Sequence, residues 1–191
     1  KMKRYIAAIM YTAIALGATP SFADSSAAAA LRTGDMKKLV FHSTPEATSS
    51  AAFFLPDGGG EKTLDDYSGK YVLVNFWATW CPPCVEEMPS LDNLHKHFAG
   101  ANFKVLGVHA GPALVTVKTF LEKHPVSFDI VIDKKMELSS WGVTGLPTTF
   151  LVSPEGEIIY KAVGEREWDS DNMFDFIEAV IAKHKQLASI H

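Results

Sequence analysis

The most constraining feature of the sequence is a pair of cysteines, Cys81 and Cys84, within the segment WCPPC at residues 80–84. They are the only two cysteines in the chain. Residues 71–77, just before them, are rich in β-branched and aromatic side chains and predict a buried strand. Residues 85–98 carry apolar side chains at helical spacing and predict a helix. The cysteines are therefore expected where a strand ends and a helix begins, one turn apart, which is the geometry of a reversible dithiol.

Cys81 is the expected nucleophile. It falls at the helix start, where unpaired backbone N–H groups and the helix dipole favour a thiolate. That thiolate would attack a partner disulfide, and Cys84 would resolve the mixed disulfide. The alternatives are a structural disulfide and half of a zinc site. A zinc site needs a second pair of ligands, and no second Cys-x-x-Cys exists, while His95 and His97 point to different faces of the helix.

Two stretches of the sequence resemble the TlpA/ResA/DsbE group of thioredoxin-like proteins. The first is VLVNFWATWCPPC at residues 72–84, followed by Glu-Glu-Met-Pro at residues 86–89. The second is WGVTGLPTTF at residues 141–150, which resembles the segment that carries the cis-proline of that fold. The order of strands and helices also fits, so the resemblance covers residues 52–185. It implies thiol:disulfide exchange as the activity.

The order of the remaining elements predicts an α/β fold, because strands alternate with helices before a final hairpin and helix. The resemblance makes this a thioredoxin-like fold, with a central mixed sheet flanked by helices. An N-terminal hairpin extension is expected from residues 52–55 and 61–63. The other expected elements are strands at 103–109, 128–132, 148–152 and 157–163 and helices at 114–124, 135–141 and 168–187.

Pro82 and Pro83 remove two amide donors from the start of the expected helix, because proline has no backbone N–H. Both residues suit the first turn, where that group has no partner anyway. Fewer donors then remain to stabilise a Cys81 thiolate, and no His or Lys lies between the cysteines. A weakly stabilised thiolate makes a reductant and a strongly stabilised one makes an oxidant, so this dipeptide favours reduction.

Glu87 is the third candidate catalytic residue. It lies three positions after Cys84, so the two share a helix face. Asn75 occupies the strand position where thioredoxins have a buried acid. In the family that the chain resembles, a glutamate at the Glu87 position takes over and helps to deprotonate the second cysteine. The alternative is an ordinary glutamate near a helix start, where the dipole favours it.

The resemblance also implies the residues that contact substrate. Pro147 would be cis and would hold its loop against Cys81. The backbone of Leu146 would then be available to pair with an incoming peptide, strand to strand. The alternative for Pro147 is a plain turn proline. The expected substrate-binding residues are Trp80, Pro82, Pro83, Leu146 and Pro147.

Residues 1–23 predict a secretory signal peptide. A short basic start precedes an apolar run at residues 5–17, and the small residues Ser21 and Ala23 stand where signal peptidase cleaves. The alternative is an uncleaved membrane anchor, although the run is shorter than the ~20 residues that cross a bilayer. In both cases the rest of the chain is expected to be exported, and cleavage after Ala23 would release it into the periplasm.

Residues 24–51 predict a largely flexible tether, because their composition is small and polar, with one short strand at residues 39–41. The thioredoxin-like domain is expected at residues 52–187. A length of 191 residues and an apolar fraction of 47% suit one domain with a sizeable core. The net charge of −4 and the lack of a basic stripe argue against nucleic acid as a partner.

The sequence therefore predicts an exported thiol:disulfide oxidoreductase that reduces protein disulfides, including cysteine pairs that await haem or copper. Its redox group would be the Cys81–Cys84 disulfide, with no other cofactor and no metal, and a membrane-embedded protein would supply electrons. Two alternatives belong to other classes. The first is a Cu(I)-handling module that uses both thiolates. The second is a thiol peroxidase, although peroxidases of this fold use a different cysteine motif. The sequence specifies no oligomeric state.

Overall fold

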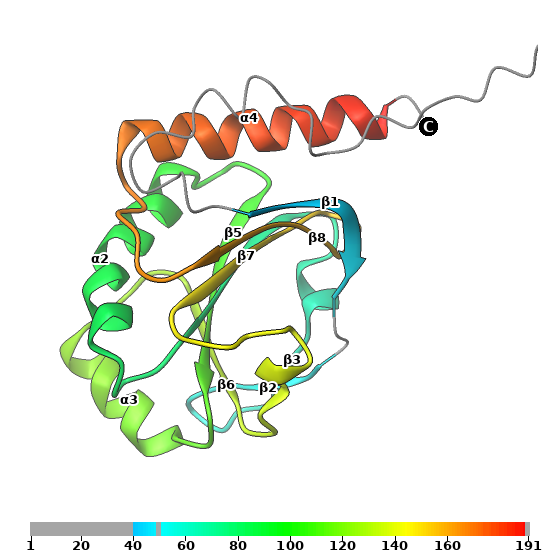
Figure 1. Ribbon diagram of the computed structural model, residues 1–191. Helices are drawn as coiled ribbons and strands as arrows, with labels where there is room; N and C mark the ends of the chain where they lie inside the picture. Colours follow the sequence, from blue (N-terminus) through cyan, green and yellow to red (C-terminus); the bar gives the residue numbers. More distant parts are fainter. Residues whose placement is uncertain (1–39, 49–50, 190–191) are drawn as a thin grey trace, which may run out of the picture.

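An eight-stranded mixed sheet forms the centre of the protein, in the order β1-β8-β7-β4-β5-β6-β2-β3 (Figure 1). The computed structural model describes residues 40–48 and 51–189. The strands are β1 (Val40–Ala47), β2 (Phe53–Phe54), β3 (Glu61–Lys62), β4 (Tyr71–Trp77), β5 (Phe103–Ala110), β6 (Asp129–Asp133), β7 (Thr148–Val152) and β8 (Glu157–Val163). The helices are α2 (Pro82–His97), α3 (Leu114–Lys123) and α4 (Asp171–Ala188), with the 3-10 helices η3 (Leu64–Tyr67) and η4 (Glu137–Ser139).

The central strand is β4, and all of its residues are buried. It pairs in parallel with β5 and antiparallel with β7. Apolar residues stand at every position of β4 except Asn75, because alternate side chains enter two different cores, one on each face of the sheet. Leu73 and Trp77 belong to one core, and Val74 and Phe76 belong to the other. Asn75 interrupts the run and lies fully buried on the face of Leu73 and Trp77.

The two faces of the sheet are covered by different elements. Helices α2, α3 and α4 cover one face, where Leu91, Val117 and Phe176 join a single apolar cluster. In Figure 1, α2 and α3 lie along one side of the sheet, and α4 crosses the top. The core on the other face is completed by the segments around η3 and η4, and it includes Tyr67 and, from strand β2 near the end of the sheet, Phe53.

The ends of three strands meet at one edge of the sheet and position the site. Strands β4, β5 and β6 are parallel, with α2 and α3 as their connections. Strand β7 runs the opposite way, so its first residue, Thr148, pairs with Phe76 near the end of β4. The loops after Trp77 and Ala110 and the loop before Thr148 therefore share one surface.

The predicted hairpin, the five predicted longer strands and three of the four predicted helices are present, with ends within about one helical turn of the expected ones. The fourth predicted helix, at residues 135–141, is only the 3-10 helix η4. Met136, just before it, has a left-handed backbone conformation with φ 58°, which a continuous helix does not allow. Helix α4 begins at Asp171, three residues after the expected start at Trp168, whose main-chain N–H donates to Ser90 Oγ on α2.

Strand β1 corrects the predicted start of the domain. We expected the domain to begin at residue 52, after a tether with only a short strand at residues 39–41. Instead, β1 spans Val40–Ala47 and pairs antiparallel with β8, with one irregularity in register. An edge strand tolerates this irregularity and the proline at position 45, because it has a neighbour on one side only. The sheet therefore begins within the predicted tether.

The predicted signal peptide at residues 1–23 lies outside the described residues. The same holds for tether positions 24–39 and 49–50. In the part of the chain that the structure describes, no helix is long and apolar enough to cross a membrane.

Candidate active site

Cys81 and Cys84 form a disulfide at the start of α2. Cys81 is the N-cap residue and Cys84 lies in the first turn, with 5.3 Å between their Cα atoms. Cys81 retains 6% of its exposure, whereas Cys84 retains 0%. A partner can therefore reach only the Cys81 sulfur without a change in the fold.

Main-chain hydrogen bonds hold Cys81 in place. Its N–H donates to the Ala78 carbonyl (3.1 Å), and its own carbonyl accepts from the Val85 N–H (3.2 Å). Pro82 and Pro83 fill the first two positions of α2, as expected, and neither has an N–H. The amide groups that could stabilise a thiolate at the helix start are thus two fewer than usual.

The peptide bond between Leu146 and Pro147 is cis, as predicted. The loop is fixed on both sides of this bond: the Gly164 N–H donates to the Pro147 carbonyl (2.8 Å), and Thr148 Oγ1 donates to the Gly145 carbonyl (2.7 Å). Among the described residues, the amide and carbonyl of Leu146 take part in no hydrogen bond. They are therefore available to an extended segment of another chain.

A cleft of about 720 Å³ opens next to Cys81. None of its lining residues is charged, and two of its large apolar side chains, Trp80 and Met136, are 71% and 52% exposed. Of the expected substrate-binding residues, Trp80, Pro82 and Leu146 line the cleft, whereas Pro83 and Pro147 do not. Apart from these three residues and Cys81, the sequence did not indicate which residues line the cleft, Met136 included. The lining residues are Trp80, Cys81, Pro82, Ala110, Gly111, Met136, Leu138, Val143, Thr144, Gly145 and Leu146.

Glu87 is 3% exposed and its carboxylate accepts three hydrogen bonds. Oε1 accepts from Asn75 Nδ2 (2.7 Å), and Oε2 accepts from the Arg166 main-chain N–H (3.1 Å) and from Trp168 Nε1 (3.0 Å). Burial raises the pKa of Glu87 to about 7, although the hydrogen bonds from Trp168, Asn75 and Arg166 act in the opposite direction. A carboxyl group with this pKa can both accept and release a proton near neutral pH.

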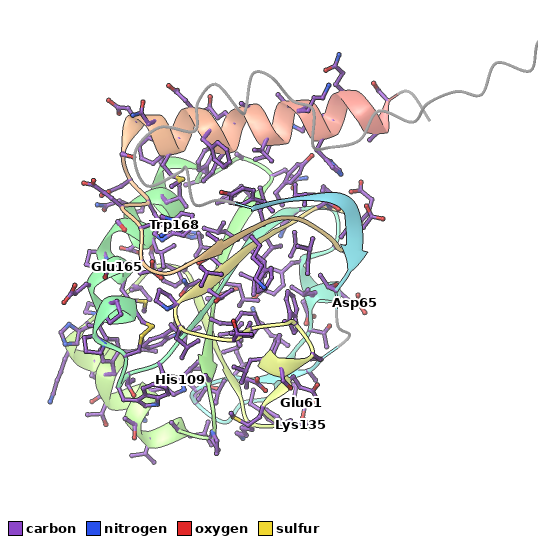
Figure 2. All side chains as sticks on the ribbon, viewed as in Figure 1. Glu61, Asp65, His109, Lys135, Glu165 and Trp168 are labelled. Carbon is purple, nitrogen blue, oxygen red and sulfur yellow. A yellow bond between two sulfur atoms is a disulfide. The ribbon has the colours of Figure 1, made fainter. Side chains whose placement is uncertain are left out.

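Arg166 and Trp168 are site residues that sequence reasoning missed. They stand 79 and 81 positions away from Glu87, in the turn between β8 and α4. Figure 2 shows Trp168 beside α2 and below the start of α4. No local pattern in the sequence connects this turn to the cysteines. Trp168 is an aromatic residue in an otherwise polar segment before the last helix, and this is the only sequence signal that could have indicated it.

His109 is a further residue near the site that the sequence did not indicate. It lies near the end of β5 (Figure 2) and is 1% exposed. Its Nε2 accepts from the Thr79 main-chain N–H (3.1 Å), and its Nδ1 lies 3.4 Å from the Gly111 carbonyl. Burial lowers the pKa of His109 and so favours the neutral imidazole. A histidine at the carboxyl end of a strand beside β4 is the signal that could have found it.

The chain matches the model of the AhpC/TSA family over residues 47–161, which is more than half of its length. Thiol-disulfide oxidoreductase ResA of Bacillus subtilis is 36% identical over 124 residues, which cover 64% of this chain and 69% of that protein. Thiol-disulfide oxidoreductase ResA of Geobacillus thermodenitrificans is 40% identical over 119 residues, which cover 60% of this chain and 68% of that protein.

Solved structures agree with these relatives. A thiol:disulfide interchange protein of the thioredoxin family from Chlorobium tepidum has a TM-score of 0.61 and 26% identity, over 72% of this chain and 97% of that one. StoA from Bacillus subtilis has a TM-score of 0.53 and 26% identity, over 62% of this chain and 91% of that one. The chain therefore belongs to the AhpC/TSA family, and it is a thiol-disulfide oxidoreductase with a thioredoxin-like fold.

Proposed function

We propose that this protein is an exported reductase of protein disulfides, with Cys81 as the attacking sulfur and Cys84 as the resolving sulfur. The observation that carries this proposal is the difference between their surroundings. Cys81 lines an uncharged cleft, whereas Cys84 is fully buried on the same helix as the buried Glu87. This difference supports Cys81 as the sulfur that meets a substrate and Cys84 as the sulfur that is deprotonated inside the protein.

The reaction proceeds in two exchanges. The Cys81 thiolate of the reduced protein attacks one sulfur of the substrate disulfide, and the other substrate sulfur leaves as a thiolate and takes a proton from water. Cys84 then loses its proton and attacks the Cys81 sulfur. This step forms the Cys81–Cys84 disulfide and releases the second substrate sulfur, again as a thiolate that becomes protonated. Two electrons pass from the protein to the substrate.

Glu87 supports the second exchange. It lies one helical turn from Cys84 on the same face of α2. Its raised pKa, about 7, is nearer to that of a thiol than an ordinary carboxyl pKa is, so proton transfer between the two groups is easier. Glu87 would take the Cys84 proton as the mixed disulfide is resolved and give it up to solvent afterwards.

The direction of the reaction follows from the surroundings of Cys81. The thiolate has lost two amide donors to Pro82 and Pro83. No cationic side chain lines the cleft around it. A thiolate with little stabilisation favours the disulfide form, and a dithiol that readily becomes a disulfide is a reductant.

The cleft indicates which substrates would fit. Its wall is apolar and uncharged, and the unpaired backbone of Leu146 lies in it next to Cys81. An extended substrate segment would pair with Leu146, and an apolar side chain next to the substrate cysteine would enter the cleft. Cysteine pairs that await haem or copper on exported proteins are candidate substrates, and a membrane-embedded protein would return electrons to Cys81.

Trapping of mixed disulfides tests the assignment of the two sulfurs. Cys84→Ser should accumulate a covalent complex with a disulfide peptide, and with partner proteins in a periplasmic extract, because Cys81 can attack but nothing can resolve. Cys81→Ser is the matched control, since it keeps the same number of thiols, and it should trap nothing. Equal trapping by both variants would overturn the assignment, and wild-type protein that fails to reduce the peptide would overturn the function.

A further inference from the structure

The turn between β8 and α4 is folded around its own arginine. The Arg166 guanidinium donates to three main-chain carbonyls of the turn: from Nη2 to Val163 (2.9 Å) and from Nη1 to Gly164 (3.2 Å) and Glu165 (2.6 Å). Arg166 is 6% exposed, so water does not compete strongly for these carbonyls. The turn is therefore held in one conformation before anything binds to it.

This turn presents two N–H groups to the same oxygen of Glu87. The Arg166 main-chain N–H and the Trp168 indole N–H both donate to Oε2. Trp168 is also held at a second point on α2, because its main-chain N–H donates to Ser90 Oγ (3.2 Å), and that hydroxyl donates to the Glu87 carbonyl (2.9 Å). With Trp168 and Glu87 only 1% and 3% exposed, the indole has no room to leave the carboxylate while α2 and the turn stay in place.

We propose that Trp168 is a positioning residue of the exchange reaction. Its indole N–H holds the Glu87 carboxylate in place and sets how readily that group takes a proton from Cys84. This proposal rests on the proposed function, because it assumes that Glu87 assists the resolving step. Trp168 does not line the cleft beside Cys81, so it would act through Glu87 and not by contact with the substrate.

The groups that face Glu87 determine in which direction the loss of the Trp168 indole N–H shifts the Glu87 pKa. From β4 comes the neutral amide of Asn75, and from the turn come the neutral indole of Trp168 and the Arg166 cation, whose attraction lowers the Glu87 pKa. On α2 itself, Cys84 becomes titratable once the disulfide is reduced. Burial is the largest influence and raises the pKa, and the hydrogen bond from Trp168 is the largest of those that lower it. Loss of the indole N–H must therefore raise the pKa further.

Trp168→Phe is the decisive variant, because it keeps an aromatic ring and removes the N–H. The Glu87 carboxyl, followed by carbon NMR in the oxidised protein, should titrate about one pH unit higher than in the wild type, a tenfold change in the ratio of charged to neutral carboxyl. The pH profile of peptide-disulfide reduction should move in the alkaline direction by a similar amount. The rate should fall about fivefold at pH 7 and recover near pH 9.

Trp141→Phe is the matched control. Trp141 is also buried, at 5% exposure, and its indole nitrogen has no hydrogen-bond partner among the described residues. This variant removes the same part of a ring without the loss of a hydrogen bond, so the titration of Glu87 and the pH profile should stay unchanged. In the background of Glu87→Gln, Trp168→Phe should have no further effect on the profile.

A second measurement needs no variant of Trp168. The indole N–H resonance of Trp168 in the wild type should move with pH at the midpoint of Glu87, and this movement should vanish in Glu87→Gln. An unchanged Glu87 titration in Trp168→Phe, an equal loss of rate at every pH, or an indole resonance that ignores pH would each overturn the role of Trp168. A shifted titration with an unchanged exchange profile would instead show that Glu87 takes no part in the reaction.

Discussion

The side-chain amide of Asn75 donates a 2.7 Å hydrogen bond to Glu87 Oε1, and this contact joins the central strand to the active-site helix. The same nitrogen donates to Thr149 Oγ1 (2.9 Å), so β4, α2 and β7 meet around one carboxylate. Asn75, Glu87 and Thr149 are all buried. An amide at this position of β4 can hold a carboxylate without a competing charge, which a buried acid there would not allow.

Glu87→Gln should leave the fold intact and slow the exchange reaction. The amide cannot accept the Cys84 proton, so the resolving step at pH 7 should slow by about tenfold or more. Stopped-flow tryptophan fluorescence, with reduced protein mixed with a disulfide peptide, measures this rate. Glu86→Gln is the matched control, because Glu86 is the adjacent residue on α2 but is exposed. Equal rates for Glu87→Gln and the wild type between about pH 6 and 9 would show that Glu87 has no role in exchange.

The pKa of Glu87 also predicts how stability depends on pH. Because this pKa is raised from the ordinary value of 4.5 to about 7, the folded protein binds the proton more tightly than the unfolded chain. The contribution of Glu87 to stability is thus complete below about pH 4.5 and is lost as the pH rises through about 7. In denaturant unfolding of the oxidised proteins, Glu87→Gln should gain up to about 3 kcal/mol over the wild type between pH 4.5 and 8. A difference that is the same at both pH values would contradict the raised pKa.

Local patterns were sufficient to predict the framework of the site. The apolar run of β4 and the two prolines of α2 determine their own conformation through neighbours in sequence, whereas the cis peptide before Pro147 was predicted from the family resemblance. The local patterns placed Cys81 and Cys84 correctly relative to β4 and α2. They also predicted that Glu87 would share a face with Cys84.

The remaining features depend on residues far apart in the chain. The Trp168 indole meets Glu87 across 81 positions, and the Thr79 amide meets His109 across 30. Such contacts are set by how α4 and β5 pack, which no short stretch encodes. Strand β1 was missed for a related reason: half of its residues are polar and one is a proline, and they form a strand by pairing with the edge of β8.

His109 predicts a second pH dependence of the free energy of unfolding, opposite in sign to that of Glu87. Its pKa is lowered in the folded protein, so its contribution to stability is present above the ordinary value of 6.5 and is lost as the pH falls through the folded value. His109→Gln keeps an oxygen that can accept from Thr79 and cannot titrate in this range, so it should remove this loss. Unfolding at pH 5 and 7.5 measures the effect, and His97→Gln, at an exposed histidine of α2, is the control. If His109→Gln lost as much stability between pH 7.5 and pH 5 as the wild type does, His109 would not be the source of that loss.

The cleft wall predicts a selective loss of substrate binding in Met136→Asn. Asparagine tolerates the left-handed conformation of Met136, so the backbone should be preserved while the apolar surface is lost. KM should rise for peptide disulfides with an apolar residue next to cysteine and should stay unchanged for hydroxyethyl disulfide, which is too small to fill the cleft. Val115→Asn changes an exposed apolar residue that does not line the cleft, and it should alter neither value. Equal effects on both substrates would mean that Met136 contacts no substrate.

The reduction potential of the Cys81–Cys84 pair should be closer to that of thioredoxin, about −270 mV, than to that of the oxidant DsbA, about −120 mV. Pro82 and Pro83 withdraw two amide donors from the Cys81 thiolate. No cationic side chain lines the cleft in their place, and Glu87 adds negative charge to the same helix above its pKa. Each of these features disfavours the charged dithiol and so favours the disulfide. The helix dipole acts in the opposite direction, but every protein with a cysteine pair at a helix start has it, so it does not distinguish reductants from oxidants. Equilibration with glutathione or dithiothreitol buffers measures the midpoint, and a value above about −150 mV would make the protein an oxidant and refute the reductase proposal.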